Sequence, residues 1–361
     1  MKGIIALSDG FVLHGSAFGY NGTSTGEVVF NTSITGYEEI LTDPSYYYQI
    51  VTMTVSEVGN YGITLADEQS PKPQVAGFII HNESRIPSNY RSKISLNDYL
   101  KENKVVGLKQ VDTRTLTRYI RSRGAMKGCI STEIGTEEEA IELAQKARDI
   151  VGIDLSTEVT TKKEYEYSST GDVRIVVIDC GVKKGILENL KNHNAKVSVL
   201  PKNITPKRLN EINPDGVVFS NGPGDPEPIN DVIELSKKVL LRYPTLGICL
   251  GHQILCLALS GKTFKLKFGH RGGNQPVKNL LTNKVEITAQ NHGFAVDYNS
   301  VKDKVVITHI NLNDSTVEGM KHKDLPVFSL QYHPEACPGP NDAKYIFSQF
   351  INTVRTYAKK K

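Results

Sequence analysis

Cys249 is the residue whose surroundings are most typical of a catalytic nucleophile. It stands in Gly247-Ile248-Cys249-Leu250-Gly251-His252-Gln253, between a short apolar run and an apolar stretch of helical length. A strand, a sharp G-x-C-x-G turn and a helix make the nucleophile-elbow arrangement, here with Cys in place of Ser. Such a turn lifts the thiol out of the sheet, and the N–H groups of the helix N-terminus lower a thiol pKa and bind an oxyanion. We therefore predict that Cys249 is a nucleophile.

The alternative for any such cysteine is a buried structural role. That interpretation suits Cys256, which follows seven positions later on the same predicted helix. Cys337 lies in HPEACPGP, at a position where a small residue such as Ser would serve as well. It has no elbow around it, so we assign it no catalytic role.

A nucleophilic cysteine needs a base, and the base needs a group that orients it. His333 and Glu335 can supply both, because the apolar run FSLQY ends in His333-Pro334-Glu335. In an extended segment, residues two apart point the same way. We therefore predict that the Glu335 carboxylate contacts the His333 imidazole.

The other histidines lack such a partner. His252 lies in the elbow helix and could pack or cap locally, and His292 lies in a polar turn, Gln290–Phe294, that could hold a small polar substrate. No histidine pair has metal-ligand spacing with a third ligand, so no metal site is predicted. Solvated or structural roles are the simplest for His14, His81 and His193.

A Gly/Pro-rich turn, Ser220–Pro226, follows the apolar run DGVVF. Two glycines in a rigid turn let backbone N–H groups approach a ligand closely. The turn lacks the spacing and the Lys of a phosphate loop. It is either an ordinary turn or, beside the elbow, part of an oxyanion or substrate site.

The elements that must position these residues alternate between strands and helices after residue 172. This pattern predicts an α/β domain over residues 173–361 with a mainly parallel central sheet, whose functional groups lie at the carboxyl ends of the strands. Residues 160–172 are polar and weakly periodic and are predicted to be a linker. Residues 1–159 show short β-rich pieces, with helices predicted at 113–123 and 136–150, so we expect a separate β-rich α/β N-terminal domain.

Composition excludes several classes of function. The 361 residues are 39% hydrophobic and carry a net charge of only +4, without a basic stripe interleaved with aromatic residues, so nucleic-acid binding has little support. No apolar run reaches the length of a membrane span and no signal peptide is recognisable, so we expect a cytoplasmic protein. Five widely spaced cysteines without a CxxC pair argue against a disulfide framework or a zinc site.

Four motifs in order, SNGPGDP, GICLGHQ, QNHGF and HPE, resemble those of class I glutamine amidotransferase domains over residues 173–355. The N-terminal half narrows this resemblance. FNTSITGYEEILTDPSYYYQIVTMT, GNYGI and VDTRTLTRYIRSRGAMKGCI are similar to the N-terminal domain of carbamoyl-phosphate synthase small subunits, which other amidotransferases of the class lack.

The resemblance implies a role for each residue of the site. Cys249 would attack the side-chain amide of L-glutamine, His333 would transfer protons, and Glu335 would orient His333. The N–H groups of Leu250 and Gly222 would hold the oxyanion. The family positions that bind glutamine correspond here to Ser45, Gly222, Gly224, Leu250, Gln253, Asn291, Gly293 and Phe294.

The resemblance also implies a partner. This chain carries no nucleotide-phosphate motif and no cofactor is predicted in it, so a large subunit would bind ATP, Mg²⁺ and bicarbonate. That subunit would receive ammonia through an internal channel and make carbamoyl phosphate for pyrimidine and arginine synthesis. The N-terminal domain would serve for docking.

Two other functions stay open from the residues alone. One is an amidotransferase for another acceptor, as in guanylate or anthranilate synthesis, and the N-terminal half argues against it. The other is a non-catalytic subunit that only binds a partner, and the intact Cys249, His333 and Glu335 argue against that.

Overall fold

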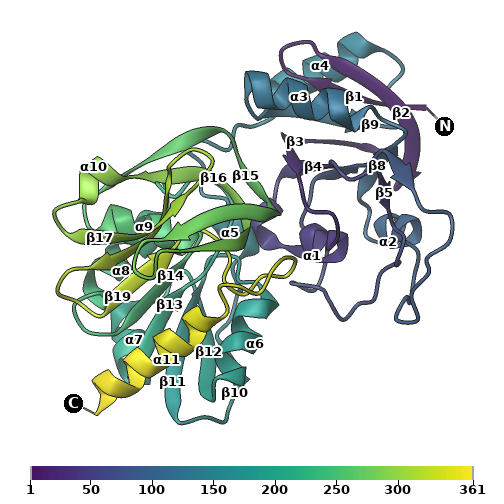
Figure 1. Ribbon diagram of the computed structural model, residues 1–361. Coiled ribbons are helices and arrows are strands. Elements are labelled where there is room, and N and C mark those ends of the chain that lie inside the picture. Colours follow the sequence, from purple (N-terminus) through teal and green to yellow (C-terminus); the bar gives the residue numbers. More distant parts are fainter. Residues whose placement is uncertain (1, 360–361) are drawn as a thin grey trace. The chain divides into compact units, whose positions relative to one another are not determined.

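A computed structural model describes residues 2–359 and divides them into two compact units (Figure 1). The first runs to Val151 and includes Lys267–Gly272, and the second comprises Gly152–Leu266 and continues from Gly273. Among the described residues, no helix combines the length and the apolar character needed to cross a membrane.

The first unit is built on a closed β-barrel in the order β1-β2-β8-β6-β4-β3-β9. Strands β3, β4, β6 and β8 run parallel to their successive neighbours, and the other pairs are antiparallel. The sequence predicted several of these short strands but not their closure. The bounds are β1 Lys2–Leu7, β2 Val12–Gly19, β3 Thr23–Asn31, β4 Gln49–Met53, β6 Gly77–Ile79, β8 Val106–Lys109 and β9 Met126–Ser131, with a separate pair β5 Glu57–Val58 and β7 Asn82–Glu83.

Helices cover this barrel: α1 Tyr37–Thr42, the 3₁₀ turn η1 Pro44–Tyr46, α2 Leu96–Glu102, α3 Thr113–Arg123 and α4 Glu137–Lys146. The predicted helix at 113–123 is confirmed. The Asp112 side chain accepts a hydrogen bond from the Thr115 N–H and caps its first turn, while Leu116 and Ile120 are buried against the barrel.

The predicted helix over residues 136–150 ends early. Thr136 caps its start, but α4 stops at Lys146 and Ala147 takes an extended conformation. The chain turns away there because Arg148 has another partner. The backbone N–H of Arg148 donates to Tyr48 Oη at 3.1 Å, and the Arg148 guanidinium lies 4.3 Å from the centre of the Tyr48 ring.

The second unit contains a ten-stranded sheet in the order β10-β12-β11-β13-β14-β19-β18-β17-β15-β16. We predicted a mainly parallel sheet, and this holds only for its centre, where β12, β11, β13, β14 and β19 are parallel. The pairs β10–β12, β18–β19, β17–β18 and β15–β17 are antiparallel. In the described structure, the helix between β15 and β19 is α10, whose four residues are too few for a crossover, and strands joined without a crossover pair in antiparallel fashion.

The bounds of the strands in this sheet are β10 Tyr165–Ser168, β11 Val173–Asp179, β12 Ala195–Pro201, β13 Gly216–Phe219, β14 Thr245–Ile248, β15 Lys262–Asn279, β16 Lys284–Asp297, β17 Val305–Asn311, β18 Val317–His322 and β19 Val327–Leu330. The helices of the unit are α5 Ser156–Val159, α6 Lys184–Asn192, α7 Pro206–Ile212, α8 Asn230–Val239, α9 Leu250–Ala258, α10 Tyr298–Val301 and α11 Tyr345–Ala358.

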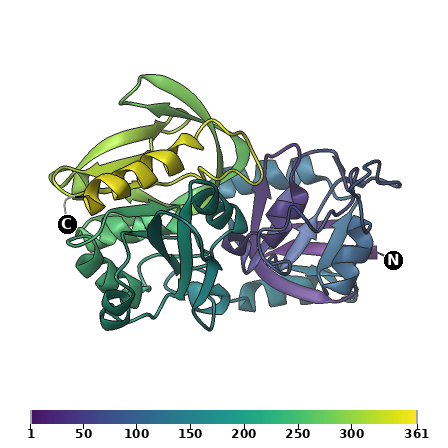
Figure 2. The same ribbon diagram turned by 90° about the horizontal axis from the view of Figure 1, so that it is seen from below.

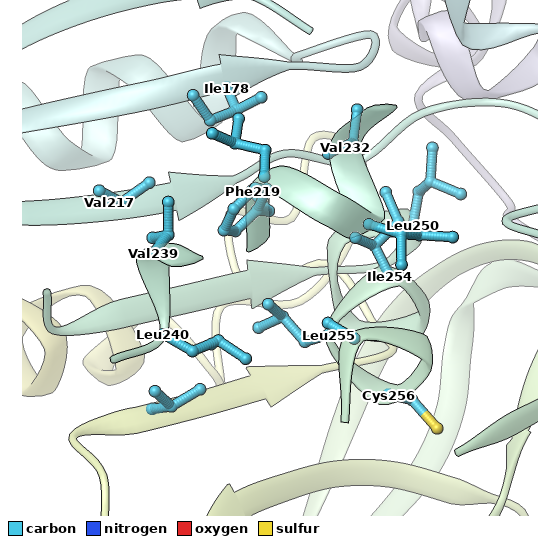
Figure 3. Packing of buried hydrophobic residues seen from close by; sticks show 14 of the residues in the cluster. Ile178, Val217, Phe219, Val232, Val239, Leu240, Leu250, Ile254, Leu255 and Cys256 are labelled. Atoms are coloured by element: carbon cyan, nitrogen blue, oxygen red, sulfur yellow. The ribbon is translucent and has the colours of Figure 1, made fainter. Parts of the chain in front are cut away.

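Helices pack on both faces of the central strands, which explains their continuous apolar runs. On one face α7, α8 and α9 form a buried cluster with the sheet, and Figure 3 shows Ile178, Val217 and Phe219 of the strands among Val232, Val239, Ile254 and Leu255 of the helices. On the other face lie α6 and the C-terminal helix α11, yellow in Figure 2.

The polar segment 160–172 was predicted to be a linker, yet it contains a strand. Residues Tyr165–Ser168 form β10, which pairs antiparallel with β12 at one edge of the sheet. Tyr165 and Glu166 are exposed and Ser168 is buried, so the polar composition of this segment reflects a partly solvated edge strand.

Truncating Phe350 of α11 tests the second core cluster. Phe350 is fully buried, so we expect Phe350→Ala to lower the free energy of unfolding by about 3–5 kcal/mol through lost burial and a cavity. The exposed neighbour Gln349→Ala is the control and should change stability little. Chemical denaturation measures both, and equal stabilities of the two variants would contradict this packing.

Candidate active site

Cys249 lies between β14 and α9 and has backbone angles of φ 54° and ψ −104°. A positive φ is uncommon for a residue with a side chain and costs of order 1–3 kcal/mol. The Cys249 N–H donates to Leu330 O at 2.8 Å, which ties the turn to the neighbouring strand β19. The predicted strand, sharp turn and helix are therefore present, and the thiol is placed at the carboxyl end of the parallel strands.

The turn requires glycine on both sides of Cys249, because neither position has room for a side chain. A Cβ on Gly247 would lie 2.7 Å from Gly251 O, and one on Gly251 would lie 2.2 Å from Phe219 O. The Gly251 N–H also donates to Ser220 O at 3.0 Å. The elbow therefore packs directly on the end of β13, where the Ser220–Pro226 loop begins.

His333 and Glu335 follow β19 and form the predicted contact. His333 Nδ1 donates to Glu335 Oε1 at 2.6 Å, and both side chains are buried. The His333 N–H donates to Ala289 O at 2.9 Å, which fixes the backbone of the segment. Within residues 2–359, His333 Nε2 forms no hydrogen bond, so this nitrogen remains available for a reacting group.

Charges around His333 and Glu335 favour the ionised forms of both. Burial lowers the pKa of His333, but the charges of Glu335 and Cys249 outweigh burial and raise it well above its ordinary value. Burial raises the pKa of Glu335, and the charges of Lys183 and His333 more than offset this and lower it. The hydrogen bond from the Cys249 N–H to Leu330 O joins the elbow to the end of β19, three residues before His333.

Lys183 is a buried cation that the sequence reasoning missed. Its Nζ lies 3.0 Å from Glu335 Oε1 and donates to Ala336 O at 2.7 Å, and its side chain is only 2% exposed. The available signal was its place in the turn between β11 and α6, because the carboxyl ends of parallel strands meet at one edge of a sheet.

The two predicted oxyanion donors lie on either side of the elbow. Leu250 is the first residue of α9, and Gly222 lies in the loop after β13. In the described part of the chain, neither N–H donates a hydrogen bond. A Cβ on Gly222 would lie 2.2 Å from Cys180 O and 2.7 Å from Leu250 Cδ2, so only glycine fits there.

Among the predicted glutamine-binding residues of α9 and β16, Asn291 contacts the thiol and Gln253 contacts Phe294. Cys249 Sγ contacts Asn291 O at 3.6 Å, and Gln253 Nε2 donates to Phe294 O at 2.8 Å. Gly293 lies between Asn291 and Phe294 in β16. A further missed residue, Gln331, accepts from Gln253 at 3.1 Å and places its Nε2 3.9 Å from Cys249 Sγ.

Two further residues predicted to bind glutamine, Ser45 and Gly224, lie outside α9 and β16. Ser45 belongs to the first unit, in η1, where its N–H donates to Asp43 Oδ1, and its place in a glutamine pocket stays a prediction. Gly224 has a φ of +83° in the loop after β13, and a Cβ there would lie 3.2 Å from Leu155 Cδ1.

The histidines and cysteines that were given no catalytic role have structural contacts. His252 Nδ1 contacts Ser329 Oγ at 2.8 Å, and burial lowers its pKa to about 3. His292 contacts Phe294 O and Gln290 Oε1. Cys256 is buried, and burial raises the pKa of its thiol to about 12. Cys337 is partly exposed and donates to Glu335 O at 3.4 Å.

Two family models match this chain. A family model described as glutamine amidotransferase class-I matches residues 176–353, and one described as carbamoyl-phosphate synthase small chain, CPSase domain, matches residues 5–130. The two matches cover the regions in which the sequence motifs were found.

Curated relatives match along almost their whole length. The carbamoyl phosphate synthase small chain of Syntrophotalea carbinolica is 52% identical over 98% of this chain and 97% of its own. The chain of that name from Clostridium perfringens is 48% identical over 97% and 99%, and that from Caldanaerobacter subterraneus is 49% identical over 100% and 98%. This chain therefore belongs to the carbamoyl phosphate synthase small chain family.

Proposed function

We propose that this chain is the glutamine-hydrolysing subunit of a carbamoyl phosphate synthase. The observation that carries the proposal is the strained Cys249 elbow beside a buried His333–Glu335 pair. A nucleophile, a base and a group that orients the base are the three parts that acyl transfer requires. Family membership supports glutamine as the substrate.

In the first half-reaction, the Cys249 thiolate attacks the side-chain amide carbon of glutamine and forms a C–S bond. The carbonyl electrons move to oxygen, and the N–H groups of Leu250 and Gly222 stabilise that oxyanion. When the tetrahedral intermediate collapses, the C–N bond breaks and His333 Nε2 gives its proton to the leaving nitrogen. The products are ammonia and a glutamyl thioester on Cys249.

In the second half-reaction, water attacks the thioester carbon and His333 Nε2 takes its proton. The C–S bond then breaks, which releases glutamate and restores the thiolate. Glu335 holds His333 by Nδ1 throughout, so that Nε2 faces the reacting atoms. Lys183 compensates the buried Glu335 carboxylate.

We propose that the ammonia passes through an internal channel to a large chain that binds ATP, Mg²⁺ and bicarbonate and makes carbamoyl phosphate. The relatives are named small chains of carbamoyl phosphate synthase, which supports such a partner. Ammonia released into water would be protonated or lost, so hydrolysis has to be shielded and coupled to the acceptor. The first unit is proposed as the docking domain, and Ser45 as its contribution to the glutamine pocket.

Replacing the nucleophile tests the proposal. In the complex with the large chain, Cys249→Ser should lower glutamate release from glutamine by about a thousandfold or more, because no thioester can form. Carbamoyl phosphate synthesis from added ammonium salts should continue. Cys337→Ser is the matched control and should retain glutamine hydrolysis. Equal hydrolysis rates for wild type and Cys249→Ser would refute the assignment.

Removing the buried cation tests the charge arrangement. Lys183 lowers the pKa values of both Glu335 and His333, so Lys183→Met should raise both. Protonated Glu335 cannot orient the base, and protonated His333 cannot accept a proton from water. Both changes therefore move the acid limb of the pH profile of kcat to higher pH, and kcat should fall by about tenfold or more.

The exposed neighbour Lys184→Met is the control for that experiment and should keep the wild-type pH profile. A Lys183→Met enzyme that folds and shows an unshifted acid limb would contradict the proposed electrostatic role of Lys183.

A further inference from the structure

Residues 152–161, here called the strap, connect two loops that the proposed mechanism uses. One is the Ser220–Pro226 loop, which carries Gly222. The other is the Asp179–Lys183 turn, which carries the cation beside Glu335. The strap contains the short helix α5 and belongs entirely to the second unit, as do both loops. No catalytic residue of the proposed mechanism lies in it.

The start of the strap contacts the Ser220–Pro226 loop at two points. The Gly152 N–H donates to Asp225 Oδ2 at 2.9 Å, while Asp225 Oδ1 accepts the Glu227 N–H of its own loop. Leu155 is 1% exposed and lies against Gly224, where an added Cβ would come within 3.2 Å of Leu155 Cγ. The loop therefore has an apolar support two residues after Gly222 and a polar support three residues after it.

The end of the strap contacts the Asp179–Lys183 turn. Thr160 Oγ1 donates to Asp179 O at 2.5 Å, and the Thr161 N–H donates to Asp179 Oδ2 at 2.7 Å. The other oxygen of the same carboxylate accepts the N–H groups of Gly181 and Val182 at 2.8 and 2.7 Å. Asp179 therefore links the strap to the backbone just before Lys183.

A buried lysine anchors the middle of the strap. Lys202, which follows β12, has a side chain that is 6% exposed, and its Nζ pairs with Asp154 of the strap and with Asp231 of α8 at 3.3 Å. The Lys202 N–H also donates to Thr160 Oγ1 at 3.1 Å. The Asp154 and Asp231 side chains are partly exposed, but an unpaired charge on the buried Lys202 would be costly, so Lys202 holds the strap to the sheet.

The two loops also contact each other. Ser220 Oγ accepts the Cys180 N–H at 2.9 Å, and Asn221 Oδ1 accepts the Lys183 N–H at 3.1 Å. A shift of either loop would therefore move both the Gly222 N–H and the Lys183 backbone.

We infer that the strap positions the oxyanion donor of the glutaminase reaction: Leu155 and the Asp154–Lys202 pair hold the Ser220–Pro226 loop so that the Gly222 N–H meets the developing oxyanion. This inference rests on the proposed function. Leu155 and Asp154 are positioning residues, because they act through the loop and do not touch substrate. A displacement of about 1 Å at a reacting group can cost on the order of a hundredfold in rate.

The test compares two reactions of Cys249 in the complex of the full chain with the large chain. Glutamine hydrolysis passes through an oxyanion, whereas alkylation of the thiol by iodoacetamide displaces iodide at a saturated carbon and builds none. Leu155→Ala should lower kcat for glutamine by about tenfold or more, with little change in KM, since oxyanion contacts act in the transition state. The alkylation rate of Cys249, corrected with Cys249→Ser, should stay near that of wild type.

Companion variants keep the result interpretable. Asp154→Asn removes the charge that pairs with Lys202 but keeps an oxygen for the Ser156 N–H, and it should lower kcat in the same selective way. Leu155→Met conserves volume and should restore kcat. Asp172→Asn breaks an exposed ion pair with Arg355 elsewhere in the unit and should leave both reactions unchanged.

Unchanged kcat in both Leu155→Ala and Asp154→Asn would overturn the inference, while glutamine hydrolysis by the wild-type complex would still support the proposed function. Equal losses of kcat and of alkylation rate would also overturn it, because they would show a general disturbance of the elbow. If Leu155→Ala fails to fold, Asp154→Asn decides alone by the same two rates. Absence of glutamine hydrolysis in the wild-type complex would instead refute the proposed function itself.

Discussion

The positive φ of Cys249 is the constraint on which the rest of the site depends. This backbone conformation is held by a hydrogen bond from Cys249 to β19 and by close contact of Gly251 with the end of β13. The parallel order β13-β14-β19 therefore sets which groups surround the thiol. The loop with Gly222 comes from one neighbouring strand, and His333 comes from the other.

Buried charge is the second requirement. Glu335 is fully buried, and a carboxylate in such a place is costly unless it is paired. His333 and Lys183 both lie within ion-pair distance of its Oε1. This arrangement keeps the carboxylate ionised and the imidazole oriented, and it ties the turn after β11 to the segment after β19. The same contacts thus stabilise the His333–Glu335 pair and the fold of the sheet around it.

The parts of the site that could be predicted from sequence are those defined by local spacing. The Cys249 elbow is a continuous motif, and His333 and Glu335 are two residues apart, so their contact follows from an extended backbone. Lys183 and Gln331 escaped prediction because their roles depend on which strands are neighbours, and no spacing along the chain reveals that. The strand within residues 165–168 and the antiparallel edge of the sheet were missed for the same reason, since pairing partners lie far away in sequence.

The formation of a glutamyl thioester on Cys249 tests the central claim most directly. The complex with the large chain is mixed with glutamine, quenched in acid during turnover, digested and examined by mass spectrometry. The account predicts a glutamyl adduct on the peptide that contains Cys249 and none on the peptides of the other four cysteines. Glutamine hydrolysis without an adduct on Cys249, or with the adduct on another cysteine, would contradict it.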